Sequence, residues 1–100
     1  MTIHIGSLND IAPRVRTVVF IGNRSSDHLR ELMRIAEFKG RAAYRIEAAS
    51  ELQPRWFAGV EEVGVVIGAA DLQNVTNTVI DRLNQFASTE ARGMLEGVAQ

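Results

Sequence analysis

The sequence predicts a single small α/β domain with three layers, in which helices cover both faces of a mostly parallel, four-stranded sheet. Two strand runs, Thr17–Ile21 and Val63–Ile67, are each followed by a glycine turn and then by an amphipathic helix. Both runs are apolar or β-branched at successive positions, which is typical of parallel strands buried on both faces. Strands and helices also alternate through short loops, as βαβ units do.

The first half of the chain is expected to hold two strands and one long helix. Thr2–Ile5 predicts a short first strand, and Pro13 limits the helical character of Leu8–Val15 to about one turn. The pair Ser26-Asp27 offers an N-cap for the helix that follows Thr17–Ile21. Gly40 is expected to end that helix. Its apolar positions recur at helical spacing, at Leu29, Leu32, Met33 and Ala36.

The middle of the chain predicts a third strand and two isolated helical turns before the fourth strand. Ala42–Ile46 reads as a short strand. Ala49–Leu52 and Pro54–Phe57 are expected to form single turns, with Pro54 near a helix start. The polar pair Glu61-Glu62 is expected to lead into the strand Val63–Ile67.

The last predicted helix begins near Asp71 and defines the end of the folded domain. Its apolar stripe consists of Leu72, Val75, Val79, Leu83 and Phe86. Residues 1–86 are therefore expected to form the α/β domain. Residues 87–100 have a weaker helical pattern and are expected to form a C-terminal tail or a short docked helix.

Composition and charge narrow the classes of function. With 100 residues the chain is long enough for one core, and its net charge of −1 gives no general attraction to nucleic acid or to anionic membranes. The absence of cysteine excludes disulfides, thiolate nucleophiles and a thiolate-held iron–sulfur cluster. No apolar run approaches 18 residues and no signal peptide is evident, so we expect a cytoplasmic protein.

The two glycine turns are the candidate binding site, because backbone amides at a helix N-terminus favour a phosphate group. If both turns lie on one edge of the sheet, they face one crevice. Arg24 would supply positive charge to that crevice. No catalytic triad, carboxylate pair or metal-ligand spacing is evident, so we assign no catalytic residue and no metal ligand. The candidate binding residues are Gly22, Asn23, Arg24, Ser25, Ser26, His28, Gly68, Ala69 and Ala70.

Three stretches, Gly40–Ile46, Trp56–Ala70 and Val79–Leu83, resemble a known family. Across roughly residues 18–86 the chain resembles the C-terminal domain of the LytB-type 4-hydroxy-3-methylbut-2-enyl diphosphate reductases. The resemblance implies one of three similar α/β domains arranged around an iron–sulfur cluster, to which each domain gives one cysteine. It also implies reductive dehydroxylation of a diphosphate substrate in the non-mevalonate pathway of isoprenoid biosynthesis.

The family's diphosphate-binding turns are only partly kept. In the first turn the resemblance maps Gly22 and Ser26 onto the family's glycine and phosphate-binding serine, whereas His28 stands at an asparagine ligand. In the second turn Gly68 and Ala69 match, whereas Ala70 replaces a diphosphate-binding serine.

The cluster cysteine has no counterpart, because the nearest equivalent position holds His4. We therefore expect no cofactor on this chain.

Two hypotheses about function follow. The chain is either a detached or degenerate reductase domain, non-catalytic alone, that acts as a binding or assembly module, with a protein partner or as a homo-oligomer. Alternatively, it is a small protein or enzyme that binds a phosphorylated metabolite at the two turns. A third interpretation, ranked below these, is a fragment related to precorrin methyltransferases. It rests on Arg16–Asn23, which resembles the closing segment of those enzymes.

Overall fold

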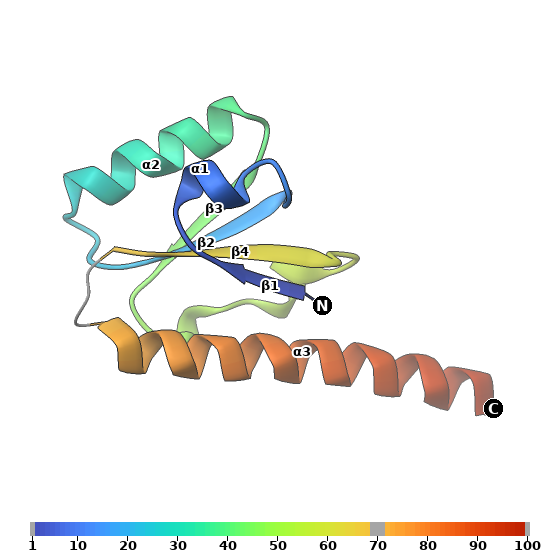
Figure 1. The fold of residues 1–100 in the computed structure, drawn as a ribbon. Coiled ribbons are helices and arrows are strands. Elements are labelled where there is room, and N and C mark those ends of the chain that lie inside the picture. Colours follow the sequence, from blue (N-terminus) through green and yellow to red (C-terminus); the bar gives the residue numbers. More distant parts are fainter. Residues whose placement is uncertain (1, 69–71, 100) are drawn as a thin grey trace.

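The computed structural model describes residues 2–68 and 72–99, and it describes side chains as far as Phe86. Four parallel strands form one sheet in the order β1-β4-β2-β3. Helices α1 and α2 cover one face of this sheet and α3 covers the other (Figure 1). The predicted three-layer α/β/α fold is therefore confirmed.

The elements follow the predicted order. Pro13 comes just after α1, and the fourth strand begins at Glu62, one residue earlier than expected. Helix α3 runs through Ala99, and the predicted boundary between residues 86 and 87 stays a prediction. The elements are β1 (Thr2–Ile5), α1 (Leu8–Ile11), β2 (Thr17–Ile21), α2 (Asp27–Phe38), β3 (Ala42–Ile46), the 3₁₀ turns η1 (Ala49–Glu51) and η2 (Pro54–Phe57), β4 (Glu62–Ile67) and α3 (Gln73–Ala99).

Strands β2 and β4 form the centre of the sheet, as predicted, and they pair with Ile21 opposite Ile67. Every residue of β2 is buried, so its two faces need separate cover. Towards α1 and α2, Val18 and Phe20 join a core with Leu8, Ile11, Val15 and Leu29. Towards α3, Val19 and Ile21 join a core with Ile46, Leu52, Phe57, Val79 and Leu83.

Helix α2 has the start and the stop that the sequence predicts. Of the pair Ser26-Asp27, the N-cap is Ser26, whose Oγ accepts a hydrogen bond from the Leu29 amide at 3.3 Å. Gly40 follows the cap residue Lys39 with φ +79°, a left-handed conformation that glycine adopts without steric cost. The chain can therefore turn back at once into β3.

Leu29 lies between the two glycine turns and explains why both begin with glycine. A Cβ at Gly22 would collide with Leu29 Cδ1. At Gly68 it would stand 2.9 Å from the same atom and 2.9 Å from the carbonyl oxygen of Ile21. Since Leu29 is only 1% exposed, its side chain has no room to withdraw.

A row of aromatic rings connects the edge strand β3 to α3. Tyr44 stacks on Trp56 with ring centroids 4.3 Å apart and an interplanar angle of 9°. Trp56 meets Phe57 edge to face, and Phe57 stacks on Phe86 of α3 at 5.9 Å. The guanidinium of Arg82 lies 5.1 Å from the Phe86 ring centroid, within the range of a cation–π contact. The η turns thus bridge the sheet edge and α3.

The central position of β4 is tested by Val65→Asp. Val65 is fully buried, so an aspartate there would leave a charge without a partner and lower the free energy of unfolding by about 3–5 kcal/mol. Ile5→Asp is the matched control, because Ile5 pairs with Val65 in register but is 50% exposed. Urea unfolding measures both variants. Equal losses in the two variants would contradict a buried central β4.

The packing role of the first glycine is tested by Gly22→Ala. The added methyl group would collide with Leu29, and overpacking of this kind costs about 1–3 kcal/mol. Gly6→Ala is the control, since a Cβ there meets Ile11 Cγ2 at an ordinary 3.7 Å. In the double variant with Leu29→Ala, the Gly22 substitution should cost much less than it does alone. Additive effects in thermal unfolding would show that Leu29 does not require the glycine.

Candidate functional site

The first glycine turn and Gly68, which begins the second, lie side by side at the carboxyl ends of β2 and β4. The amide of Gly68 donates to the carbonyl oxygen of Ile21 at 2.8 Å, which joins the start of one turn to the other. Ligands of open α/β sheets bind at this end of the strands. The predicted candidates Ala69 and Ala70 lie outside the described residues, so only the start of the second turn can be placed.

The first turn is held by its own polar groups. Asn23 Oδ1 accepts from both the amide and the hydroxyl of Ser25, each at 2.8 Å. The amide of Ser26 donates to the carbonyl oxygen of Asn23 at 3.1 Å, and the Ser26 hydroxyl caps α2. Several groups predicted to face a ligand therefore stabilise the turn itself.

Glu47 and Arg45 stand beside this turn, and neither was among the sequence-based candidates. The amide of Arg24 donates to Glu47 Oε1 at 2.9 Å. Arg45 Nη1 lies 3.7 Å from the same oxygen and donates to the carbonyl of Gly22 at 3.4 Å. Strand β3 brings both residues here, because it pairs with β2 and places Ile46 opposite Ile21. Only the strand order reveals this neighbourhood.

His28 is exposed on the first turn of α2 and lines a groove of about 560 Å³. The groove runs between α2, α1 and the ends of β1 and β4, and its other walls are mostly apolar, including Ile5, Leu32 and Ile35. His28 thus belongs to the groove as well as to the helix start. Arg24 is exposed, as a cation that meets a ligand from solvent would be.

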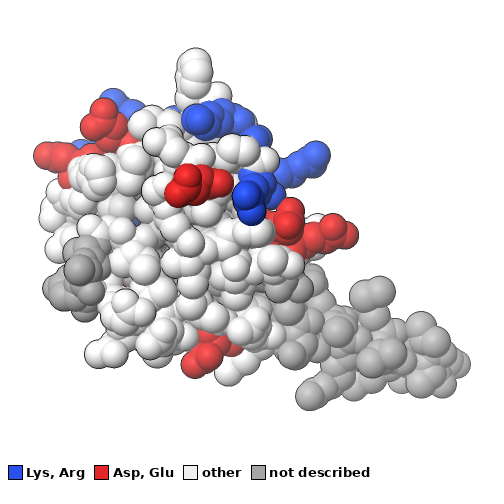
Figure 2. All heavy atoms as spheres, viewed as in Figure 1, with Lys and Arg blue, Asp and Glu red and all other residues white. Residues whose placement is uncertain are grey.

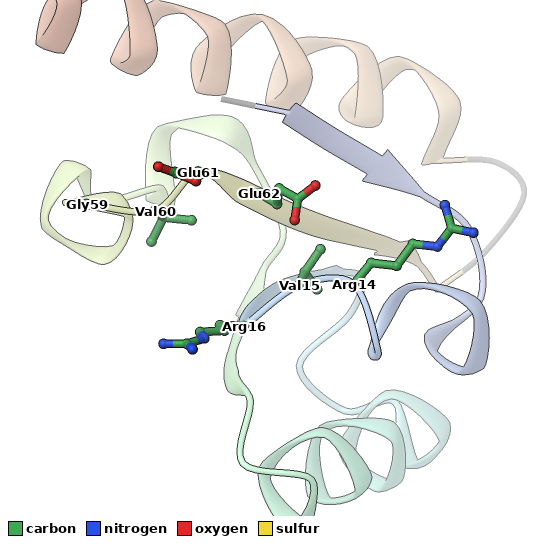
Figure 3. A pocket seen from close by; sticks show the side chains of 7 residues that line it. All are labelled: Arg14, Val15, Arg16, Gly59, Val60, Glu61 and Glu62. Atoms are coloured by element: carbon green, nitrogen blue, oxygen red, sulfur yellow. The ribbon is translucent and has the colours of Figure 1, made fainter.

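A second hollow of about 360 Å³ lies at the opposite end of the sheet (Figure 3). Arg14 and Arg16, before β2, point away from each other, and Glu61 and Glu62 come from the chain entering β4. Charges of both signs line it, and it lies at the amino ends of the strands. It is therefore a weaker candidate than the glycine turns.

Charge on the face seen in Figure 2 is mixed rather than of one sign. Lys and Arg side chains are interspersed with Asp and Glu over the layer of α1 and α2, and much of the surface below them is uncharged. This face therefore presents no single-sign patch of the kind that attracts nucleic acid. Among the described residues, none of the helices combines the length and the hydropathy that a membrane span requires.

The residues present do not fit the iron–sulfur cluster that the family resemblance implies. The chain has no cysteine, and His4 turns its Nε2 to Glu62 Oε1 at 3.3 Å. In residues 2–68 and 72–86, no group of three His, Cys, Asp or Glu side chains could hold a metal ion. Every buried side-chain nitrogen or oxygen described there already has a hydrogen-bond partner, so none is left for a cofactor to satisfy.

Comparison with known proteins gives one consistent result. The family model described as LytB protein matches residues 5–84. The 4-hydroxy-3-methylbut-2-enyl diphosphate reductase of Tolumonas auensis is 36% identical over 90 residues, which cover 90% of this chain and 29% of the relative. The reductase of Methylibium petroleiphilum is 36% identical over 84 residues, which cover 84% of this chain and 26% of that relative.

Solved structures agree. A structure of (E)-4-hydroxy-3-methyl-but-2-enyl diphosphate reductase, described as the terminal enzyme of the non-mevalonate pathway, matches with a TM-score of 0.71 and 35% identity, over 78% of this chain and 28% of that one. The Plasmodium falciparum E-1-hydroxy-2-methyl-but-2-enyl-4-diphosphate reductase has a TM-score of 0.68 at 16% identity, covering 74% and 23%, and supports the fold alone.

The chain thus spans between a quarter and a third of the curated relatives described above. The family model, in contrast, covers most of this chain, from the end of β1 into α3. The sheet and helices described above have the fold of the matched reductase structure over the shared part. This chain is a member of the LytB protein family.

Proposed function

We propose that this LytB-family domain binds a diphosphate or similar phosphorylated group at the turn Gly22–Ser26, next to Gly68. We further propose that it acts as a binding or assembly module and does not carry out the reduction by itself. The observation that carries the proposal is the pair of adjacent glycine turns at the carboxyl ends of the central strands. The relatives that match this chain are named as reductases of a diphosphate compound.

The start of α2 supplies the donors. Within residues 2–68 and 72–99, the amides of Asp27 and His28 donate to no other group, so both are available to an anion. The helix dipole and such amides favour a negative charge by about 0.3–1 kcal/mol at an exposed site. Arg24 adds a guanidinium from the same turn. The free amides, the helix dipole and the guanidinium together support weak binding, and the affinity should decrease as salt is added.

The proposed lack of stand-alone chemistry has separate support. This chain supplies no thiolate for a cluster, and it matches under a third of a reductase relative. Reduction would therefore depend on groups beyond these 100 residues, so a protein partner or a second copy is part of the proposal. Cytoplasmic location stays a prediction.

Binding is tested by titrating inorganic diphosphate into the ¹⁵N-labelled chain and following amide shifts by NMR. We expect saturable shifts at Asp27 and His28, whose amides are available, and at Gly22, Arg24 and Ser26 in the same turn. Arg24→Ala should weaken the affinity about two- to fivefold, because it removes an exposed cation.

Arg14→Ala serves as the control, because Arg14 lines the hollow at the other end of the sheet. It should leave the affinity unchanged. Shifts confined to Arg14, Arg16 and the segment before β4 would place the anion in that hollow and remove support from the turn.

Cluster binding is tested by reconstituting the chain anaerobically with iron and sulfide and then desalting it. Because cluster irons are held by cysteine thiolates in almost all cases, we expect little retained iron and no cluster absorption band. A full-length reductase relative, treated in parallel, is the positive control. Stoichiometric iron on this chain, or turnover of the diphosphate substrate without a partner, would refute the non-catalytic interpretation.

A further inference from the structure

Glu47 places a carboxylate at the very turn proposed to bind an anion. Its Oε1 accepts the Arg24 amide at 2.9 Å and lies 3.7 Å from Arg45 Nη1. The turn and β3 therefore already hold one oxyanion between a backbone amide and a guanidinium, the two kinds of donor that bind phosphate oxygens.

The backbone behind this carboxylate is fixed by a second acid. Glu51 Oε2 accepts the amide of Glu47 at 2.7 Å and that of Ala48 at 2.8 Å. On the other side, the amide of Gly22 donates to the carbonyl oxygen of Ile46 at 3.0 Å. The residue that carries the carboxylate is thus tied to both η1 and the turn, although its side chain is half exposed.

We infer that Glu47 is an internal ligand of the turn and lowers the affinity of the turn for an added anion. The inference rests on the proposed anion binding at Gly22–Ser26. While Glu47 is in place, its charge offsets that of Arg45 and repels an incoming anion. A ligand must displace this carboxylate or bind beside it, so Glu47 weakens anion binding, and it does so most for groups of high charge such as diphosphate.

The inference is tested by Glu47→Gln with inorganic diphosphate as the probe. Glutamine has the same shape, and its amide oxygen can still accept the Arg24 amide, so the turn keeps its geometry. Removing one negative charge beside the site of a multiply charged anion should raise the affinity about five- to tenfold. The chemical shift change of the Arg24 amide on titration should also be larger in this variant.

Glu37→Gln is the matched control. Glu37 is an exposed residue near the far end of α2, so this variant changes the net charge equally but leaves the turn untouched. We expect less than a twofold change. An ¹⁵N correlation spectrum of each variant without ligand confirms that it is folded.

The outcomes separate the two proposals. If the unmodified chain binds diphosphate at Gly22–Ser26 and Glu47→Gln binds no more tightly than Glu37→Gln, Glu47 is not an internal ligand and the proposed function still stands. If neither the unmodified chain nor Glu47→Gln shows shifts at the turn, both proposals are wrong. A gain specific to Glu47→Gln, localised at Arg24, supports both.

Discussion

The burial of β2 and β4 on both faces is the constraint on which the rest of this domain depends. Two adjacent strands with no solvent face need one helical layer above and another below. Helices α1 and α2 supply the first layer, and α3 with the η turns supplies the second (Figure 1). The same pairing brings the ends of the two strands together, so the fold itself creates the adjacent glycine turns.

Much of the fold could be predicted because its signals are local. The apolar runs of β2 and β4, the Ser26 cap and the Gly40 stop each depend on a few neighbouring residues. The strand order could not be predicted in the same way. The pairing of β1 with β4 joins residues about 60 positions apart, and nothing in Thr2–Ile5 specifies that partner.

The candidate site could be predicted only in part, for the same reason. Its turns were found from the glycines, and their adjacency is confirmed. That Leu29 fills the space beside Gly22 and Gly68 could not be read from the sequence, since a helix residue in one unit packs against a turn in another. The carboxylate of Glu47 reaches the turn only because β3 pairs with β2. Contacts across strands thus decide how open the site is.

The stacking of Tyr44 on Trp56 gives the domain a built-in optical reporter. Trp56 is the only tryptophan of the chain, so tryptophan fluorescence comes from one place, the junction of β3, η2 and, through Phe57, α3. Loosening of the α3 layer changes the surroundings of this indole. Events confined to α1 and α2, on the other face of the sheet, leave its emission nearly constant. Comparing fluorescence with circular dichroism, which reports all helices, therefore distinguishes separation of one layer from unfolding of the whole domain.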